Sequence, residues 1–190
     1  MFRIGATALP RMPATGRPEM SATPNVGGYG DGINRRRQIQ MSAPEAQGLL
    51  HEARTMTVCT FNHDGTIHAV AMWYGFLEGD LAFQTKAKSQ KAVNLRRDPR
   101  ITCLVESGES YDELRGVELV GWAELIEDPS RLWDIGVSVF ERHVGPYEEK
   151  EHRSQVEAML YKRVGVKVHA NRTVTWDHTK LRAPPGSGTQ

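Results

Sequence analysis

The sequence predicts a mainly β protein, a small antiparallel barrel of six to seven strands with helices at its periphery. Three observations favour this class. Short apolar runs separated by turn residues follow one another in meander order, helical periodicity occurs only at intervals, and the sequence has neither an internal repeat nor a glycine-rich dinucleotide fingerprint. A parallel doubly wound sheet would instead alternate strands and helices regularly.

A helix is the first ordered element that the sequence predicts. Ser42 supplies an N-cap, Pro44 suits the first turn, and Glu45 completes a capping box ahead of an apolar stripe. A hairpin follows, with strands at residues 55–61 and 66–76 joined by an Asn-His-Asp-Gly turn.

The later elements continue the meander and add helices. In order, they are a strand at 81–85, a basic helix that opens at Ser89 and stops at Asp98-Pro99, strands at 101–106 and 117–126, a helix from Asp128 to about Gly145, and a helix at 148–160. Two last strands, at 163–170 and 173–176, are predicted to be joined by a tight turn at Asn171-Arg172.

The two ends of the chain are predicted to lie outside the barrel domain. Residues 1–41 are expected to be a disordered extension, because the first 40 mix six Gly and four Pro without periodicity. The barrel domain is predicted to span residues 42–182, with a flexible tail at 183–190. The run Arg35-Arg36-Arg37 is interpreted as solvated charge, with contact to an acidic ligand as the alternative.

Composition restricts the classes of partner. With 190 residues, of which 39% are apolar, the chain suffices for one domain with a sizeable core, and its net charge of +1 argues against a nucleic-acid partner. Cys59 and Cys103 lie in apolar strand patterns and are interpreted as buried reduced thiols. Because the sequence has no signal peptide and no apolar run near the ~18 residues of a membrane span, we expect a cytoplasmic protein.

A basic turn between a strand and a helix is the most informative feature of the sequence. Residues 86–100 carry six basic side chains against one acidic one. The helix start at Ser89 presents free N–H groups and the positive end of the helix dipole, and Lys86, Lys88 and Lys91 can reach the same spot. The turn therefore predicts an anion site suited to a phosphate, with a solvated helix start as the alternative.

Four segments carry a resemblance to a known family. They are Trp73-Tyr74, the turn at 85–91, the run Asn94-Leu95-Arg96-Arg97-Asp98-Pro99-Arg100, and the late Trp176-Asp177-His178-Thr179-Lys180-Leu181. Through these segments, residues 42–182 resemble split β-barrel flavin/deazaflavin oxidoreductases of the pyridoxamine 5'-phosphate oxidase-like superfamily. The Ala-Lys-Ser-Gln-Lys turn and the Trp-Asp-His-x-Lys-Leu ending resemble the actinobacterial branch that uses the deazaflavin coenzyme F420.

The resemblance implies an FMN-binding-like split barrel that forms a homodimer with two cofactor sites at the subunit interface. It implies that the basic turn holds the cofactor's phosphate and that the second strand lies against its ring. The expected cofactor-binding residues are Val70, Ala71, Met72, Trp73, Thr85, Lys86, Lys88, Ser89 and Lys91, with Trp176 and His178 as candidates that reach the partner's cofactor or the substrate.

The second strand is physically suited to a flat ring. Ala69 and Ala71 project from one face and leave room beside the backbone, and Trp73 offers an aromatic wall. The alternative is that small and bulky residues alternate here to fill a barrel interior. For Trp176 the alternative is a core aromatic in the last strand.

The leading hypothesis is a reductase in which reduced coenzyme F420 passes a hydride to an unsaturated or quinone-like small molecule. No triad, metal-ligand spacing or carboxylate pair in the sequence identifies a catalytic acid or a metal, which suits a cofactor that carries the hydride itself. An FMN-dependent oxidase or reductase would use the same turn. Outside the enzymes, the same residues are compatible with a cofactor or tetrapyrrole carrier, or with an RNA-binding barrel that stacks bases on Trp73 and Phe83.

Overall fold

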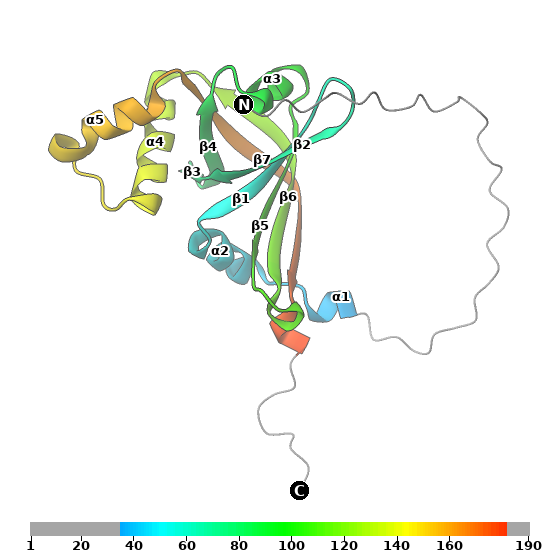
Figure 1. Cartoon of the computed structure of the whole chain (residues 1–190). Coiled ribbons are helices and arrows are strands. Elements are labelled where there is room, and N and C mark those ends of the chain that lie inside the picture. The colour runs from blue at the N-terminus through cyan, green and yellow to red at the C-terminus, as the bar shows by residue number, and fades with distance from the viewer. Residues whose placement is uncertain (1–34, 182–190) are drawn as a thin grey trace, which may run out of the picture. The chain divides into compact units, whose positions relative to one another are not determined.

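The computed structural model describes residues 35–181 (Figure 1). The elements are, in order, α1 Arg35–Gln38, α2 Ala43–Glu52, β1 Thr55–Phe61, β2 Ile67–Trp73, β3 Gly75–Leu77, β4 Asp80–Lys86, α3 Gln90–Arg97, β5 Arg100–Ser107, the 3-10 turn η1 Tyr111–Glu113, β6 Arg115–Ile126, α4 Pro129–His143, α5 Glu149–Leu160, β7 Arg163–Asp177 and the 3-10 turn η2 His178–Leu181.

One curled sheet organises the fold. Its seven strands follow the order β2-β1-β5-β6-β7-β4-β3, every neighbouring pair is antiparallel, and β2 and β3 lie at the two ends of this order. Helix α3 lies at one end of the curled sheet and η2 at the other, while α4 and α5 stand to one side of β3 and β4 (Figure 1). The prediction of a mainly β, antiparallel split barrel is confirmed.

The hydrophobic core fills the inside of the curl. Alternate residues of the central strands point inward, and Val58, Phe83, Cys103, Val117 and Val166 are fully or almost fully buried there. Helix α2 adds its apolar stripe to this core. A smaller cluster, formed by Leu77, Ala82, Ile126, Ile135 and Val139, lies where α4 packs on the sheet. Both clusters include residues of β4, the strand that leads into the candidate site.

Helix α2 begins at the predicted capping box. The Ser42 N–H donates to Glu45 Oε2 at 2.6 Å, and Lys180 Nζ donates to the same oxygen at 2.8 Å. The bonds from Lys180 and then from Ser42 lower the pKa of Glu45 to about 2. Lys180, near the end of the barrel domain, therefore stabilises the start of α2.

Residues 35–41 differ from the predicted extension. Helix α1 lies within them, and Met41 is buried, with its N–H donating to Thr175 Oγ1 at 3.0 Å. The carbonyl of Ile39 accepts a bond from the Asp177 N–H. These residues are ordered because the end of β7 offers them partners that local composition does not reveal. The rest of the predicted extension and the predicted tail at 183–190 lie outside the described residues.

The predicted strand at 66–76 is two strands. The chain pairs with β1 as far as Trp73, and from Gly75 it pairs with β4 at the other edge of the sheet. Tyr74 lies between the two and is completely buried, with its hydroxyl donating to Leu50 O at 2.8 Å and to Ala53 O at 3.1 Å. This single buried residue interrupts an apolar run that looks continuous in the sequence.

The predicted turn at Asn171-Arg172 is wrong. Strand β7 is continuous over 15 residues and pairs along the whole length of β6. Val120 pairs with Arg172 and Gly121 pairs with Ala170, so Asn171 is the extra residue of a β-bulge. A short polar stretch such as Asn171-Arg172 is compatible with either a turn or a bulge. Here it forms a bulge, because β6 is long enough to pair with β7 on both sides of it.

The expectation of buried thiols holds for Cys103 and in part for Cys59. Cys103 is buried and Cys59 half-buried, and neither forms a disulfide within residues 35–181. Burial raises the pKa of Cys103 to about 12. Within those residues, no helix is long and apolar enough to cross a membrane.

Arg142 of α4 supports the crossing at Tyr74, and its loss should destabilise the fold. Its guanidinium donates to the carbonyls of Leu50, Ala53 and Tyr74 at 2.7–3.1 Å. Arg142→Met should lower the free energy of unfolding by about 1–3 kcal/mol, since it removes bonds to part-buried carbonyls. Urea denaturation measures the change.

Arg153→Met is the matched control for this experiment. Arg153 forms exposed ion pairs with Glu149 and Glu157 on α5, so its loss should lower the free energy of unfolding less than the loss of Arg142 does. Equal losses for the two variants would contradict a supporting role for Arg142.

Candidate functional site

The basic turn joins the end of β4 to the start of α3. Thr85 is buried at the end of β4, and Ser89 caps the helix by accepting a bond from the Ala92 N–H at 3.4 Å. The amide groups of Gln90 and Lys91 lie in the first turn, where a helix offers its N–H groups no internal acceptor. The predicted helix start at Ser89 is therefore confirmed, and it presents free donors.

Lys91 points back into the turn. Its side chain is almost completely buried, and Nζ donates to Thr85 Oγ1 at 3.2 Å; Thr85 Oγ1 lies in turn 3.1 Å from Ser89 Oγ. Burial lowers the pKa of Lys91, and the nearby Arg163 lowers it further. Lys91 forms no ion pair with any carboxylate among residues 35–181. Three predicted residues, Thr85, Ser89 and Lys91, are thus brought together.

Arg163 is a second cation at this place, and no pattern in the sequence singles it out. It begins β7 and pairs with Lys86 of β4. Its Nε atom is buried and has no hydrogen-bond partner among residues 35–181. Two neighbouring cations and the unpaired Arg163 Nε–H raise the free energy of the protein unless an anion is bound. Their arrangement therefore fits a phosphate or another small oxyanion. The four residues Thr85, Ser89, Lys91 and Arg163 are called the cradle below.

Lys86 and Lys88 lie outside this group of contacts. Lys86 is exposed, and its Nζ donates to the Tyr161 carbonyl at 3.2 Å, at the end of α5. Lys88 is exposed, and its side chain has no bonded partner among residues 35–181. Their charges add to the positive field over the turn, whereas Lys91 is buried and Arg163 is half-buried with a buried Nε atom.

The arginines at the other end of α3 are structural. Arg96 donates to Ala87 O at 2.7 Å, Arg97 donates to the Phe61 carbonyl, and Arg100 forms a two-pronged ion pair with Asp98. Each guanidinium is occupied by a protein acceptor.

Strand β2 presents its small residues outward. Ala69, Ala71 and Trp73 are exposed, while Val70 and Met72 point the other way and pack against the core. The alternative in which the alanines fill the barrel interior is thus not supported. Because β2 ends the sheet order, its backbone groups that face away from β1 have no strand partner within residues 35–181.

Trp73 is held in place by a second aromatic ring. It stacks on His143 of α4 with ring centroids 4.3 Å apart and planes inclined by 5°, yet remains 52% exposed. Burial lowers the pKa of His143, which favours a neutral imidazole near pH 7. The sequence contains no signal for this pairing, because 70 positions separate the two residues.

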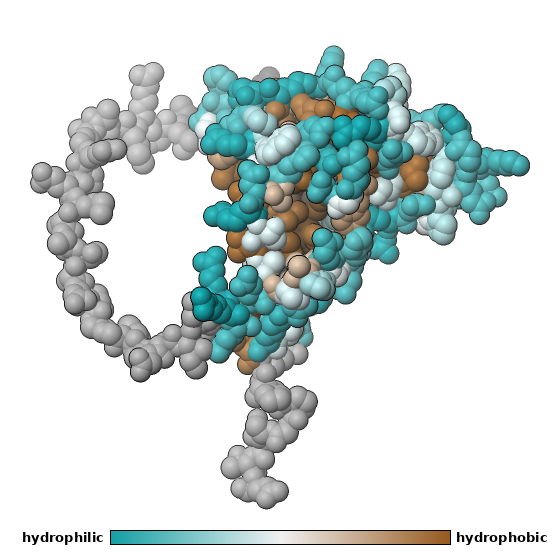
Figure 2. Space-filling model, turned by 180° about the vertical axis from the view of Figure 1, so that it is seen from behind, coloured by the Kyte–Doolittle hydropathy of each residue, from teal (hydrophilic) through white to brown (hydrophobic). Residues whose placement is uncertain are grey.

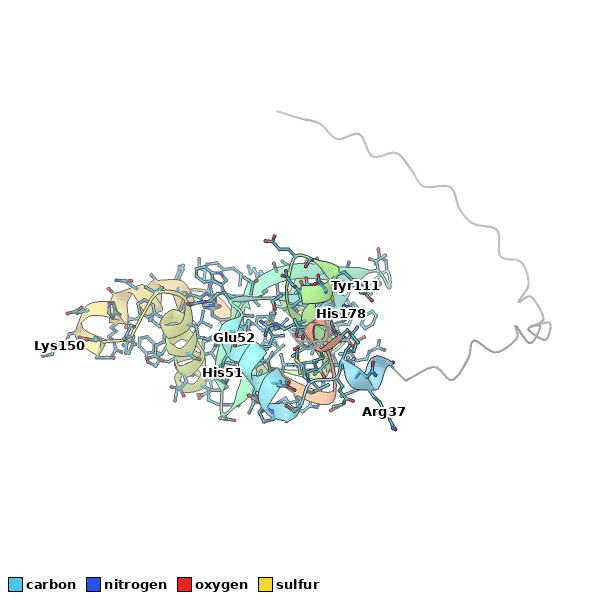
Figure 3. The ribbon with its side chains drawn as sticks, turned by 90° about the horizontal axis from the view of Figure 1, so that it is seen from below. Arg37, His51, Glu52, Tyr111, Lys150 and His178 are labelled. Atoms are coloured by element: carbon cyan, nitrogen blue, oxygen red, sulfur yellow. The ribbon has the colours of Figure 1, made fainter. Side chains whose placement is uncertain are left out.

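Trp176 and His178 lie at the opposite end of the sheet. Trp176 covers Gly116, where a β carbon would lie 2.1 Å from the indole ring. His178 Nδ1 lies 2.8 Å from the Tyr111 carbonyl oxygen, and the two side chains sit side by side (Figure 3). Along β7, Arg163 and Trp176 are separated by up to about 40 Å. One chain therefore does not bring these two residues to the cradle.

Comparison with known families agrees with the split-barrel fold. A family model described as pyridoxamine 5'-phosphate oxidase matches residues 42–177. A comparison with curated proteins gave no match.

Solved structures give further likenesses. The structure of a conserved hypothetical protein from Mycobacterium tuberculosis is 48% identical, with a TM-score of 0.75, and the match covers 80% of this chain and 95% of that one. A protein described as an F420 reductase is 25% identical, with a TM-score of 0.52, over 67% of this chain and 94% of that one. A heme storage protein from Vibrio cholerae shares the fold at 14% identity, with a TM-score of 0.56, over 70% of this chain and 94% of that one.

The cradle predicts an unusual response to substitution. Lys91→Met removes one of two neighbouring cations, so the variant should unfold at the same temperature as the wild type or higher in phosphate-free buffer. Inorganic phosphate should stabilise only the wild type, by about 1.4 kcal/mol at ten times its Kd. Thermal unfolding with and without phosphate measures both effects. Equal stabilisation of the two proteins would contradict an anion site at Lys91.

Proposed function

The chain belongs to the pyridoxamine 5'-phosphate oxidase family, and from this premise we propose that it is a reductase that uses coenzyme F420. In this proposal the reduced deazaflavin supplies a hydride to an unsaturated or quinone-like small molecule. The observation that carries the proposal is the buried Lys91 near the half-buried Arg163, whose Nε atom is buried without a partner. Neither cation has a counter-anion among residues 35–181, and the cofactor's phosphodiester would supply one.

The cradle residues would bind and orient the cofactor. Lys91 and Arg163 offer charged donors, Ser89 and Thr85 offer hydroxyls, and the first turn of α3 offers N–H groups. Lys86 and Lys88 would contribute at longer range through their charge. Such contacts lie away from the reacting atoms, so their role is to fix the position of the cofactor.

Strand β2 would take the ring. The face of Ala69 and Ala71 allows close approach to the backbone of Val70 to Trp73, whose free N–H and C=O groups match the polar edge of a flavin or deazaflavin. Trp73, stacked on His143, would form a wall that excludes water from one side. The neutral imidazole of His143, stacked on Trp73, would be a group at this wall that can move a proton.

The choice of coenzyme F420 over FMN rests on the turn motif and on the comparisons. The F420 reductase structure is the neighbour whose name states a cofactor of this kind, and the mycobacterial relative fits the actinobacterial branch. FMN remains the alternative cofactor, since its phosphate monoester would use the same four cradle residues. A carrier of a cofactor or tetrapyrrole, with no turnover, is the alternative outside enzymes.

We also propose that the protein is a homodimer with cofactor sites at the subunit interface. The exposed face of β2 includes Ile67 and Trp73, which are 64% and 52% exposed. The molecule seen from behind also presents apolar surface framed by hydrophilic side chains (Figure 2). Burial of such a patch by a second copy would be favourable. Trp176 and His178 would then reach the partner's site. A cytoplasmic location is consistent with the two free cysteines.

Cofactor titration tests the proposed function. The wild-type protein should bind coenzyme F420 saturably, and more tightly than FMN, in fluorescence titrations at physiological salt. Lys91→Ala and Arg163→Ala should each weaken binding at least tenfold, because each removes a charged contact worth about 1.5–3 kcal/mol. Preference for FMN would move the protein to the flavin alternative.

Lys150→Ala is the matched control, since Lys150 lies on α5 far from the sheet (Figure 3). If its effect equals that of Lys91→Ala, nonspecific charge explains the binding and the cradle is refuted. Tight binding without turnover in an acceptor screen would favour the carrier.

Mixing two binding-deficient variants tests the shared site. If Trp176 serves the partner's cofactor, Lys91→Ala and Trp176→Ala homodimers should each bind poorly. After subunit exchange, a heterodimer contains one site with both residues intact, so about a quarter of the wild-type binding capacity should return. His178→Ala repeats the experiment if Trp176→Ala unfolds. No recovery in a confirmed heterodimer would exclude a site built from two chains.

A further inference from the structure

A buried amide links the helix that carries part of the cradle to the hairpin that contains the candidate ring strand. Asn94 of α3 is completely buried. Its Nδ2 atom donates to Thr60 Oγ1 and to Asn62 Oδ1, both at 3.0 Å, and its Oδ1 atom accepts a bond from Gln90 Nε2 at 2.9 Å. Both amide hydrogens and the amide oxygen are thus used, as is usual for a buried polar side chain.

The partners of Asn94 belong to the two parts of the proposed cofactor site. Gln90 is the first residue of α3 and directly follows Ser89 of the cradle. Thr60 lies on β1, where it pairs with His68 of β2, and Asn62 directly follows β1. One side chain therefore bonds both to the helix turn beside the cradle and to the hairpin that contains β2.

Within the sheet, the two parts of the proposed site are far apart in strand order. The cradle begins on β4 and the ring strand is β2, and β1, β5, β6 and β7 lie between them in that order. Helix α3 follows β4 and bonds to the β1–β2 hairpin at one end of the curled sheet (Figure 1). Among residues 35–181, the other side-chain hydrogen bond between α3 and this hairpin runs from the exposed Arg97 to the Phe61 carbonyl. Asn94 therefore makes the buried part of this connection.

We propose that Asn94 is a positioning residue that fixes the cradle relative to strand β2, so that the phosphate and the ring of one cofactor can occupy both places at once. This role rests on the proposed function and adds no contact with the cofactor, because Asn94 is buried and acts through Gln90 and Thr60. A ligand held at two places gains affinity over its separate parts only when the spacing of those places suits its linker. Loss of Asn94 should therefore weaken binding of the intact cofactor and leave binding of each part unchanged.

The test compares the intact cofactor with its two parts, each titrated into the full-length protein. Inorganic phosphate probes the cradle alone, and the phosphate-free deazariboflavin portion of the cofactor probes β2 alone. Asn94→Leu nearly retains the side-chain volume and removes all three hydrogen bonds. It should weaken binding of coenzyme F420 at least about fivefold, while the Kd values for phosphate and for the deazariboflavin stay within about twofold of wild type. If the wild type prefers FMN, FMN and riboflavin replace the two deazaflavins.

Two further variants separate positioning from folding. Asn62→Ala removes one bond to Asn94 from a half-buried position next to a turn, so it should fold even if Asn94→Leu does not. It should weaken binding of coenzyme F420 alone, by a smaller factor. Leu49→Val is the control for lost stability, because it reduces core packing at α2 and keeps every bond of Asn94. This control should bind all three probes as the wild type does.

Two results would overturn the role of Asn94 and leave the proposed function standing. The first is wild-type affinity for the intact cofactor in both Asn94→Leu and Asn62→Ala, which would mean that the spacing does not depend on this amide. The second is an equal loss of affinity for the cofactor and for its separate parts, which would assign Asn94 a structural role only. Failure of the proposed function itself is a different result, in which the wild-type protein binds neither coenzyme F420 nor FMN, and the positioning role would then be refuted with it.

Discussion

The burial of Tyr74 is the constraint on which the rest of the structure depends. This residue lies where the chain leaves β2 at one edge of the sheet and enters β3 at the other. Its hydroxyl and the Arg142 guanidinium satisfy the carbonyls of Leu50 and Ala53 at the end of α2, so a polar cluster holds the crossing in an apolar interior. Because of this crossing, strands that are distant in the sheet order are consecutive in the chain. The candidate ring strand and the cradle thus belong to one short segment.

The cradle shows the usual conflict between stability and function. The burial of Lys91 near the half-buried Arg163 disfavours the free protein, because a cation loses hydration close to a second positive charge and the Arg163 Nε donor has no partner among residues 35–181. A hydrophobic residue at either position would pack more favourably. In the proposed function, a bound anion would make both charges favourable, and the unfavourable energy of the two cations in the free protein would be relieved in the complex.

Local patterns in the sequence predicted the elements that local physics determines. The capping box at Ser42, the helix start at Ser89 and most strands follow from neighbouring residues, and all are found. The features that the sequence did not predict depend on residues far apart in the chain. The break at Tyr74 depends on carbonyls of α2, and the bulge at Asn171 depends on the length of β6. Arg163 could not be predicted as a candidate site residue, because it lies near the turn only when β7 pairs with β4.

The segment from Trp176 to Leu181 is held by contacts within its own chain, and this bears on how a shared site would work. Trp176 is packed on Gly116, and His178 contacts the Tyr111 backbone. Lys180 binds Glu45. These contacts fix the segment at the end of the sheet remote from the cradle, so it has no freedom to fold back over its own chain. A role in cofactor binding therefore requires a partner, to which the segment would offer a wall already in place. Binding to such a wall costs little conformational entropy.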